Sequence, residues 1–331
     1  MNRLDSVRDM VSNTPLLEID LTYCGKPMKI YAKAEYYNLT GSIKDRVAYY
    51  ILRKAAETGT LKPGDVIAEA TSGNTGIAFC AAGTYLGHKV VIYMPDWMSQ
   101  ERIRLMESFG AEVRLVSKEE GGFLGSIAMT EELARQGGVF LPRQFSNEEN
   151  VNAHIEDTGA EILGQLEKLG KKPGGVVAGV GTGGTVMGLA RAFRLANPAA
   201  KAFPLEPANS PTLSTGYKTG NHKIQGISDE FIPSIVKLDE LDEVVSVDDV
   251  DSIIMAKRLS RELGLGVGIS SGANLIGAVS KARNIPEGTV MVTVFADDNK
   301  KYLSTDYSRA WEAKEDYISS KIELRGYRAV R

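Results

Sequence analysis

Lys44 follows a polar turn, Asn38–Ser42, and opens a stretch whose apolar residues recur at helical spacing. A lysine in such a place is usually a solvated surface cation. Three further polar, glycine-rich segments are each expected at a strand-to-helix junction: Thr71–Gly76, Gly179–Thr185 and Gly268–Gly272. Backbone N–H groups at such junctions, together with the positive end of the helix dipole, can bind anions. One amine and three such segments indicate a single bound cofactor.

The segment Gly179-x-Gly181-x-x-Gly184 is the clearest candidate for a phosphate site, with hydroxyl donors from Thr182 and Thr185. No lysine follows it as a P-loop requires, which argues against a Walker-type nucleotide hydrolase. The spacing also satisfies the dinucleotide fingerprint, and Glu206 lies about 22 residues further on. An NAD-dependent dehydrogenase is therefore an alternative, although it leaves Lys44 without a role.

The other two segments each have a simpler interpretation. Thr71–Thr75 suits a carboxylate, but Ser72 or Asn74 could merely cap a helix. Four polar residues around one glycine are more than a cap needs. Ser270 could likewise be a helix cap, or its hydroxyl could face a heteroaromatic nitrogen.

The elements that must position these residues alternate between strands and helices, which predicts an α/β fold with mainly parallel sheets. The expected strands are 30–33, 65–69, 89–93, 112–116, 139–141, 175–178, 202–205, 243–245 and 289–295. The expected helices include 44–58, 75–86, 100–109, 127–136, 151–169, 186–195, 247–263, 273–282 and 306–318. The charged tail 321–331 is expected to pack weakly or to serve an interface.

Composition bounds the function classes. The chain has 331 residues and a net charge of −3, with a pI near 5.8, so a nucleic-acid or anionic-membrane partner is not expected. The first residues show no apolar signal segment, which favours a cytoplasmic protein. Cys24 and Cys80 are not in metal-binding spacing, and His88, His154 and His222 are scattered, so neither a metal site nor a disulfide is predicted.

Taken together, the segments resemble the cysteine synthase and cystathionine β-synthase family of pyridoxal-phosphate enzymes. The resemblance runs from Asn13 to Thr305 in the family's order. It rests on the motifs Gly41-Ser42-Ile43-Lys44-Asp45-Arg46, Thr71-Ser72-Gly73-Asn74-Thr75-Gly76, Gln144-Phe145-Ser146-Asn147, Gly181-Thr182-Gly183-Gly184-Thr185, His222-Lys223-Ile224-Gln225-Gly226-Ile227 and Gly268-Ile269-Ser270-Ser271-Gly272.

The resemblance implies fold type II, which is like the β subunit of tryptophan synthase, with two three-layer α/β domains in a homodimer. The smaller, mobile domain would comprise residues 38–147. The larger one, with the phosphate loop, would comprise 1–37 and 148–331.

By the same resemblance, Lys44 holds pyridoxal 5′-phosphate as a Schiff base and then acts as base on the substrate Cα proton. Asn74 bonds the ring hydroxyl and Ser270 the pyridine nitrogen. The phosphate is bound by Gly181, Thr182, Gly183, Gly184 and Thr185. The substrate α-carboxylate is bound by Thr71, Ser72, Gly73, Thr75 and Gln144.

The implied activity is β-replacement or β-elimination on a small L-amino acid in cysteine metabolism, with a sulfide or thiol co-substrate. A neutral serine at the ring nitrogen should not hold a proton there, so loss of a β-substituent to give an α-aminoacrylate is favoured over a long-lived carbanion. A non-enzymatic binding module of the same fold is a further alternative.

One segment departs from the pattern of the sulfide-using synthases. Where those have a small glycine-rich turn, this chain reads Ser228-Asp229-Glu230-Phe231. A thiol with a pKa near 8.5 gains from a carboxylate that handles its proton, whereas sulfide does not need one. Asp229 and Glu230 are therefore candidate catalytic residues of an enzyme that consumes cysteine and releases hydrogen sulfide. The simpler interpretation is a solvated acidic turn.

Overall fold

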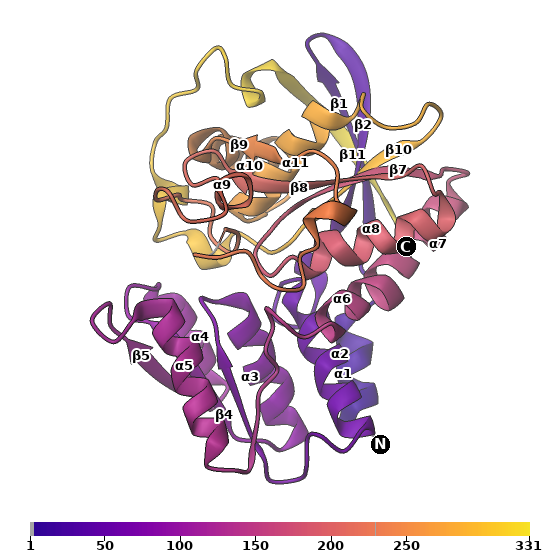
Figure 1. Cartoon of the computed structure of the whole chain (residues 1–331). Helices are drawn as coiled ribbons and strands as arrows, with labels where there is room; N and C mark the ends of the chain where they lie inside the picture. Colours follow the sequence, from indigo (N-terminus) through magenta and orange to yellow (C-terminus); the bar gives the residue numbers. More distant parts are fainter. Residues whose placement is uncertain (1–2, 229) are drawn as a thin grey trace. The chain divides into compact units, whose positions relative to one another are not determined.

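The computed structural model describes residues 3–228 and 230–331 (Figure 1). The chain forms two compact units. The smaller unit contains the residues up to Ser12 and Asn38–Ala153, and the larger contains Asn13–Tyr37 and His154–Arg331. The chain therefore passes from one unit to the other after Ser12, after Tyr37 and after Ala153. The expected domains, a smaller and mobile one of residues 38–147 and a larger one of 1–37 and 148–331, stay a prediction.

The smaller unit is built on a parallel sheet of four strands in the order β5-β4-β3-β6. The strands are β3 (Val66–Ala70), β4 (Val90–Pro95), β5 (Glu112–Val116) and β6 (Val139–Phe140). The helices are α1 (Arg3–Val11), α2 (Lys44–Glu57), α3 (Asn74–Leu86), α4 (Gln100–Ser108), α5 (Gly122–Arg135) and α6 (Glu149–Ala153).

Alternate strand residues of this sheet are buried on both faces. Ile67 and Ile92 belong to a cluster with α2 and α3, whereas Ala68 and Val91 pack with α5. Because neighbouring residues of a strand point to opposite faces, both faces of the sheet are covered. Helices therefore sandwich the sheet.

The larger unit is built on a mixed sheet of seven strands in the order β11-β1-β2-β10-β7-β8-β9. The strands are β1 (Leu16–Tyr23), β2 (Lys26–Ala34), β7 (Pro173–Gly179), β8 (Lys201–Pro207), β9 (Val245–Val247), β10 (Val290–Phe295) and β11 (Ile322–Val330). The pairs β1–β2 and β1–β11 are antiparallel, and the other pairs are parallel.

The helices of the larger unit include a π-helix, η2 (His154–Gly159), which continues into α7 (Ala160–Lys168). The others are α8 (Gly184–Ala196), α9 (Thr212–Thr215), α10 (Asp249–Leu263) and α11 (Ile269–Lys281). Short 3₁₀ turns lie at η1 (Glu35–Tyr37), η3 (Leu238–Glu240), η4 (Lys300–Tyr302), η5 (Asp306–Ser308) and η6 (Ser319–Lys321). Helix α8 packs on β7 and β8, and α11 packs on β7 and β10.

The α/β class with mainly parallel sheets is thus confirmed, but three local expectations are wrong. The tail does not pack weakly, because its residues Ile322–Val330 form β11, which pairs with β1; a role at an interface stays a prediction. The stretch 306–318 contains only the turn η5 instead of a helix. The run before Ser270 is a loop with a single bridge between Val267 and Asp298 instead of a strand.

Within the part of the chain that the structure describes, no helix combines the length and the apolar character needed to cross a membrane.

Candidate active site

The turn before α2 is fastened by the carboxylate of Asp45. Its Oδ2 accepts hydrogen bonds from the backbone N–H groups of Thr40, at 2.9 Å, and Ser42, at 3.3 Å, and its Oδ1 accepts one from the Thr40 hydroxyl at 2.7 Å. Gly41 has φ +79°, which favours glycine at this place. Lys44 is half-buried and is the first residue of the helix. Its amine is thus carried on an ordered backbone.

The segment Thr71–Gly76 joins β3 to α3, as expected. The hydroxyl oxygen of Thr71 accepts a hydrogen bond from the Gly73 amide at 3.1 Å. A Cβ at Gly73 would lie 2.6 Å from Nε of Arg102, so glycine lets the loop approach a buried guanidinium. Gly73 is the N-cap and gives no side-chain cap, so neither Ser72 nor Asn74 has the role of a helix cap.

Gln144 is tied to this loop within the smaller unit. Its side-chain carbonyl accepts from the Thr75 hydroxyl at 2.6 Å, and its amide donates to the carbonyl of Ala70 at 2.9 Å. The Asn150 amide donates to its backbone carbonyl at 2.8 Å. The structure therefore brings Gln144 together with the Thr71–Thr75 segment, although about 70 residues separate them in sequence.

Glu69 is a buried residue of this region that belongs to none of the sequence motifs. Its carboxyl accepts hydrogen bonds from the backbone amides of Ala70, at 3.0 Å, and Gln144, at 3.3 Å. Burial raises its pKa to about 8, against the lowering effect of those amides and of Arg143. An acid inside an apolar strand was the signal that could have identified it.

The glycine-rich loop after β7 has the geometry expected of a phosphate site. Helix α8 begins at Gly184 without a side-chain cap, and its N-cap Gly183 has φ +87°. A Cβ at Gly181 would lie 2.4 Å from the carbonyl oxygen of Gly226, and one at Gly183 would lie 2.2 Å from Cγ2 of Val236. Only glycine fits these positions, so the loop backbone is brought close to the Gly226 segment. This fits a phosphate bound by main-chain N–H groups.

Glu206 does not fit the dinucleotide alternative. One of its oxygens accepts from the backbone amides of Leu213 and Ser214, and the other accepts from the hydroxyls of Ser214 and Ser246. The carboxylate thereby caps α9 and joins it to β9. Both carboxylate oxygens are therefore occupied by protein donors, whereas the dinucleotide alternative requires this carboxylate to bind a ribose hydroxyl.

Ser270 lies in the first turn of α11 and is buried. Gly268 occupies the N-cap position without a side-chain bond, and the hydroxyl of the neighbouring Ser271 accepts from the Ala296 amide at 3.0 Å. The Ser270 hydroxyl makes no hydrogen bond to another described residue. A buried hydroxyl of this kind suits a ligand atom such as a heteroaromatic nitrogen.

The acidic turn is described only in part, because Asp229 lies outside the described residues. Glu230 is partly exposed and pairs with Lys218 at 3.3 Å. Ser228 donates from its backbone amide to the carbonyl of Val180 at 2.7 Å, and its φ is +57°. Ser228 is therefore held against Val180, near the start of the glycine-rich loop.

Among the described residues, no three His, Cys, Asp or Glu side chains gather as they would to hold a metal ion. The residues present fit pyridoxal phosphate in two respects: a backbone loop that excludes side chains, for the phosphate, and a buried hydroxyl on α11, for the ring.

Comparisons with known proteins identify the family of the chain. A family model described as "Pyridoxal-phosphate dependent enzyme" matches residues 7–297. The chain is 41% identical to a probable cysteine synthase of Bacillus subtilis, over 90% of this chain and 96% of that protein. It is 56% identical in sequence to a hydrogen sulfide-producing enzyme from Fusobacterium nucleatum. The crystal structure of that enzyme superimposes with a TM-score of 0.94, over 98% of this chain and 97% of that one. The cysteine synthase of Entamoeba histolytica is 35% identical, with a TM-score of 0.84 over 96% and 94% of the two chains.

Proposed function

This chain belongs to the family of pyridoxal-phosphate dependent enzymes, and from that premise we propose that its amino-acid substrate is cysteine and its product hydrogen sulfide. It is an enzyme of the cysteine synthase kind, with pyridoxal phosphate as cofactor, and it catalyses β-replacement on a small amino acid. The observation that carries the finer proposal is the 56% identity, over nearly the whole chain, to an enzyme that produces hydrogen sulfide. Identity to the Bacillus subtilis cysteine synthase relative is lower, at 41%.

When bound, the cofactor supplies an electron sink that allows the β-substituent of an amino acid to leave. In the proposed mechanism Lys44 holds the cofactor and moves the proton at the substrate Cα. The glycine-rich loop binds the phosphate through Gly181, Thr182, Gly183, Gly184 and Thr185. Asn74 and Ser270 orient the ring at its hydroxyl and its nitrogen.

The substrate carboxylate is assigned to the start of α3. The residues proposed to bind it are Thr71, Ser72, Gly73, Thr75 and Gln144. This assignment is supported by the uncapped helix start, which favours an anion, and by the bond between Thr75 and Gln144, which places the Gln144 amide beside that start. The Thr75 hydroxyl gives its one proton to Gln144, and the Gln144 amide gives one of its two protons to Ala70, so these contacts leave the second amide proton of Gln144 for the carboxylate.

The thiol proton is assigned to the acidic turn. A departing thiolate needs a proton, and an incoming thiol must lose one, so a carboxyl group near the β-carbon serves both directions. Asp229 and Glu230 are the proposed carriers. The attachment of Ser228 to Val180 supports this, because it keeps the residue that begins this segment beside the glycine-rich loop.

The test is a comparison of kcat/KM for cysteine, followed by released sulfide, with that for O-acetylserine plus sulfide. We expect cysteine to be the better substrate. Asp229→Asn or Glu230→Gln should lower the rate with cysteine about a hundredfold while changing O-acetylserine turnover little. A clear preference for O-acetylserine, with both variants unchanged, would instead assign the chain to cysteine synthesis, the second candidate supported by its cysteine synthase relatives.

We also propose a cytoplasmic homodimer, on the family resemblance. Light scattering of the purified holoenzyme should then give about twice the chain mass of 35.8 kDa. A monomer mass at micromolar concentration would contradict it.

A further inference from the structure

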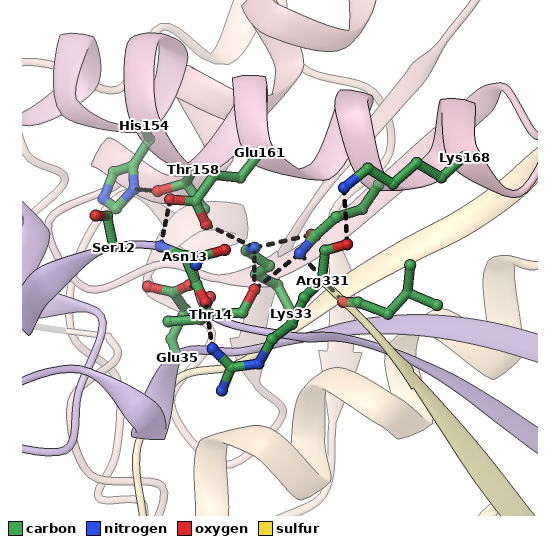
Figure 2. A network of polar contacts seen from close by, with 12 residues as sticks. Ser12, Asn13, Thr14, Lys33, Glu35, His154, Thr158, Glu161, Lys168 and Arg331 are labelled. Carbon is green, nitrogen blue, oxygen red and sulfur yellow. Dashed lines mark hydrogen bonds and ion pairs between the residues drawn. The ribbon is translucent and has the colours of Figure 1, made fainter. Parts of the chain in front are cut away.

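His154 is a fully buried histidine for which the proposed mechanism has no task. It is the first residue of the π-helix η2. Its Nδ1 lies 2.9 Å from the hydroxyl of Thr158, and its Nε2 lies 3.3 Å from the hydroxyl of Thr185. Figure 2 shows the ring beside Thr158, with the bond between them. The imidazole thus bridges two buried hydroxyls, one of which belongs to the glycine-rich loop.

Gly159 explains how the ring comes so close to that loop. A Cβ at this position would lie 2.6 Å from Cβ of Ala192 on α8 and 2.9 Å from the carbonyl oxygen of His154. Because glycine has no Cβ, η2 can lie directly on α8, the helix whose first turn carries Thr185. A π-helix inserted between two α-helical segments is common at functional sites.

The hydrogen-bond roles follow from what each group can give. A threonine hydroxyl has one proton, so Thr185 cannot donate to the imidazole and to an anion at once. If Thr158 donates to Nδ1, the ring proton sits on Nε2, and Nε2–H donates to the Thr185 oxygen. The Thr185 proton is then free to point away from the ring.

We propose that His154 is a positioning residue for the cofactor phosphate: it turns the hydroxyl of Thr185 outward as a donor, with its own tautomer fixed by Thr158. This inference rests on the assignment of the glycine-rich loop to the phosphate. It adds to that assignment a buried relay, Thr158–His154–Thr185, confined to the larger unit. Such a relay preorganises the phosphate donor before the ligand arrives.

If the relay exists, two amide replacements of the imidazole should behave differently. The amide nitrogen of glutamine reaches about as far as Nε2, so His154→Gln retains a donor to Thr185. The amide of asparagine reaches only as far as Nδ1, so His154→Asn retains the Thr158 contact and loses the other. His88→Gln is the matched control, because its ring bonds the Asp65 carbonyl in the smaller unit.

Two measurements report on the phosphate independently of turnover. One is the dissociation constant of pyridoxal phosphate, titrated into the cofactor-depleted full-length chain. The other is the ³¹P chemical shift of the holoenzyme. We expect His154→Ala and His154→Asn to weaken binding about three- to tenfold and to move the ³¹P resonance, as for the loss of one hydrogen bond. His154→Gln and His88→Gln should stay near wild type.

Thr185→Val distinguishes failure of the phosphate assignment of the glycine-rich loop from failure of the role proposed for His154. If this variant keeps wild-type cofactor affinity, the assignment of the loop to the phosphate fails, and the relay fails with it. If it loses affinity while His154→Ala keeps both the wild-type affinity and the wild-type ³¹P shift, only the relay fails. If His154→Ala and Thr185→Val each weaken binding and the double variant binds no more weakly than Thr185→Val, the two residues act as one unit and the proposal holds.

Discussion

At the scale of single residues, the site depends on side chains that hold the backbone as well as on those that face the ligand. Asp45 shows this most clearly, because its carboxylate accepts three hydrogen bonds from the turn that precedes Lys44. The carboxylate also lies in the first turn of α2, where a negative charge is favourable. The amine is therefore placed by its neighbour in sequence.

Replacing Lys44 with alanine should lower turnover by at least about a thousandfold, because the group that moves the Cα proton is lost. The purified variant should also lose the absorbance band of the bound cofactor that borohydride bleaches in the wild type. Lys62→Ala, which changes an exposed lysine of the same unit, is the control. A Lys44→Ala enzyme with wild-type absorbance and rate would contradict the assignment.

Glu69 gives a pH dependence of stability. Its pKa is raised by burial from 4.5 to about 8 in the folded protein. The folded chain therefore binds more protons than the unfolded chain between these values, and stability falls as pH rises through that range. Glu69→Gln should remove this pH-dependent loss of stability. The loss in the wild type is at most about 5 kcal/mol, which is the free energy equivalent to the pKa shift of Glu69.

Thermal unfolding midpoints of the wild type and the Glu69→Gln variant at pH 6 and pH 9 measure the effect. The variant should gain on the wild type as pH rises. Glu119→Gln, at an exposed position of the same unit, should give the same difference from wild type at both values. Parallel curves for Glu69→Gln and the wild type would show that the carboxyl does not titrate in this range.

The residues named from sequence are those whose motifs are local. Lys44, Asn74 and Gly181–Thr185 each lie in a short run that could be recognised by itself. Glu69 and His154 were missed as parts of the site because their partners come from distant segments, such as Gln144 and Thr185. One sequence contains no signal for such pairs.

At the scale of elements, hydrophobic runs predicted β2 and the parallel strands of the larger sheet, but neither β1 nor the edge strand β11. Strand β11 lies at that edge, and most of its residues are exposed or half-buried. A charged edge strand discourages pairing with other chains and also hides the apolar alternation that identifies a strand. The stretch 306–318 shows the opposite error. There Lys257 of α10 donates to the carbonyl of Arg309 at 2.7 Å, and Asp251 of α10 accepts from the amide of Ile318 at 3.0 Å, so tertiary contacts override helix propensity.

Packing of η2 on α8 gives a prediction at this scale. Gly159→Ala should destabilise the larger unit by about 1–3 kcal/mol, because the added methyl would overlap Ala192. It should also weaken cofactor binding, since His154 would be displaced from Thr185. Gly164→Ala, on α7 with open space around it, should be neutral or stabilising by about 0.5–1 kcal/mol.

Urea unfolding followed by circular dichroism, together with cofactor titration, measures both effects. Equal behaviour of the two alanine variants would mean that the close approach at Gly159 is unimportant.

At the scale of the whole molecule, the larger unit is assembled from segments far apart in sequence. Lys33 on β2 is fully buried and donates to the Thr14 carbonyl at 2.7 Å and to the side chains of Glu161 and Gln165 at 2.8 Å (Figure 2). Gln165 also donates to the Val330 carbonyl at 3.2 Å. Lys33 and Gln165 together thus join the N-terminal strands, α7 and the C-terminal strand.

The sequence contains little to announce such a network. Lys33 occurs in an ordinary apolar strand, and its partners lie about 130 residues away in α7. Sequence patterns could predict the strand, because β2 has the apolar spacing of a buried segment. They could not predict that its lysine is fully buried, because burial depends on which elements cover it.

Lys33→Met should therefore destabilise the fold by about 3–5 kcal/mol, because it leaves the carboxylate of Glu161 without its buried partner. Lys29→Met is a matched control on the same strand. Its ammonium pairs with Glu18 at 2.7 Å but is largely exposed, so the loss should be below about 1 kcal/mol. The double variant Lys33→Met/Glu161→Gln should recover part of the lost stability, because the uncompensated charge is gone. Urea unfolding at neutral pH measures all three, and equal losses for Lys33→Met and Lys29→Met would contradict the idea that the buried network holds the distant segments together.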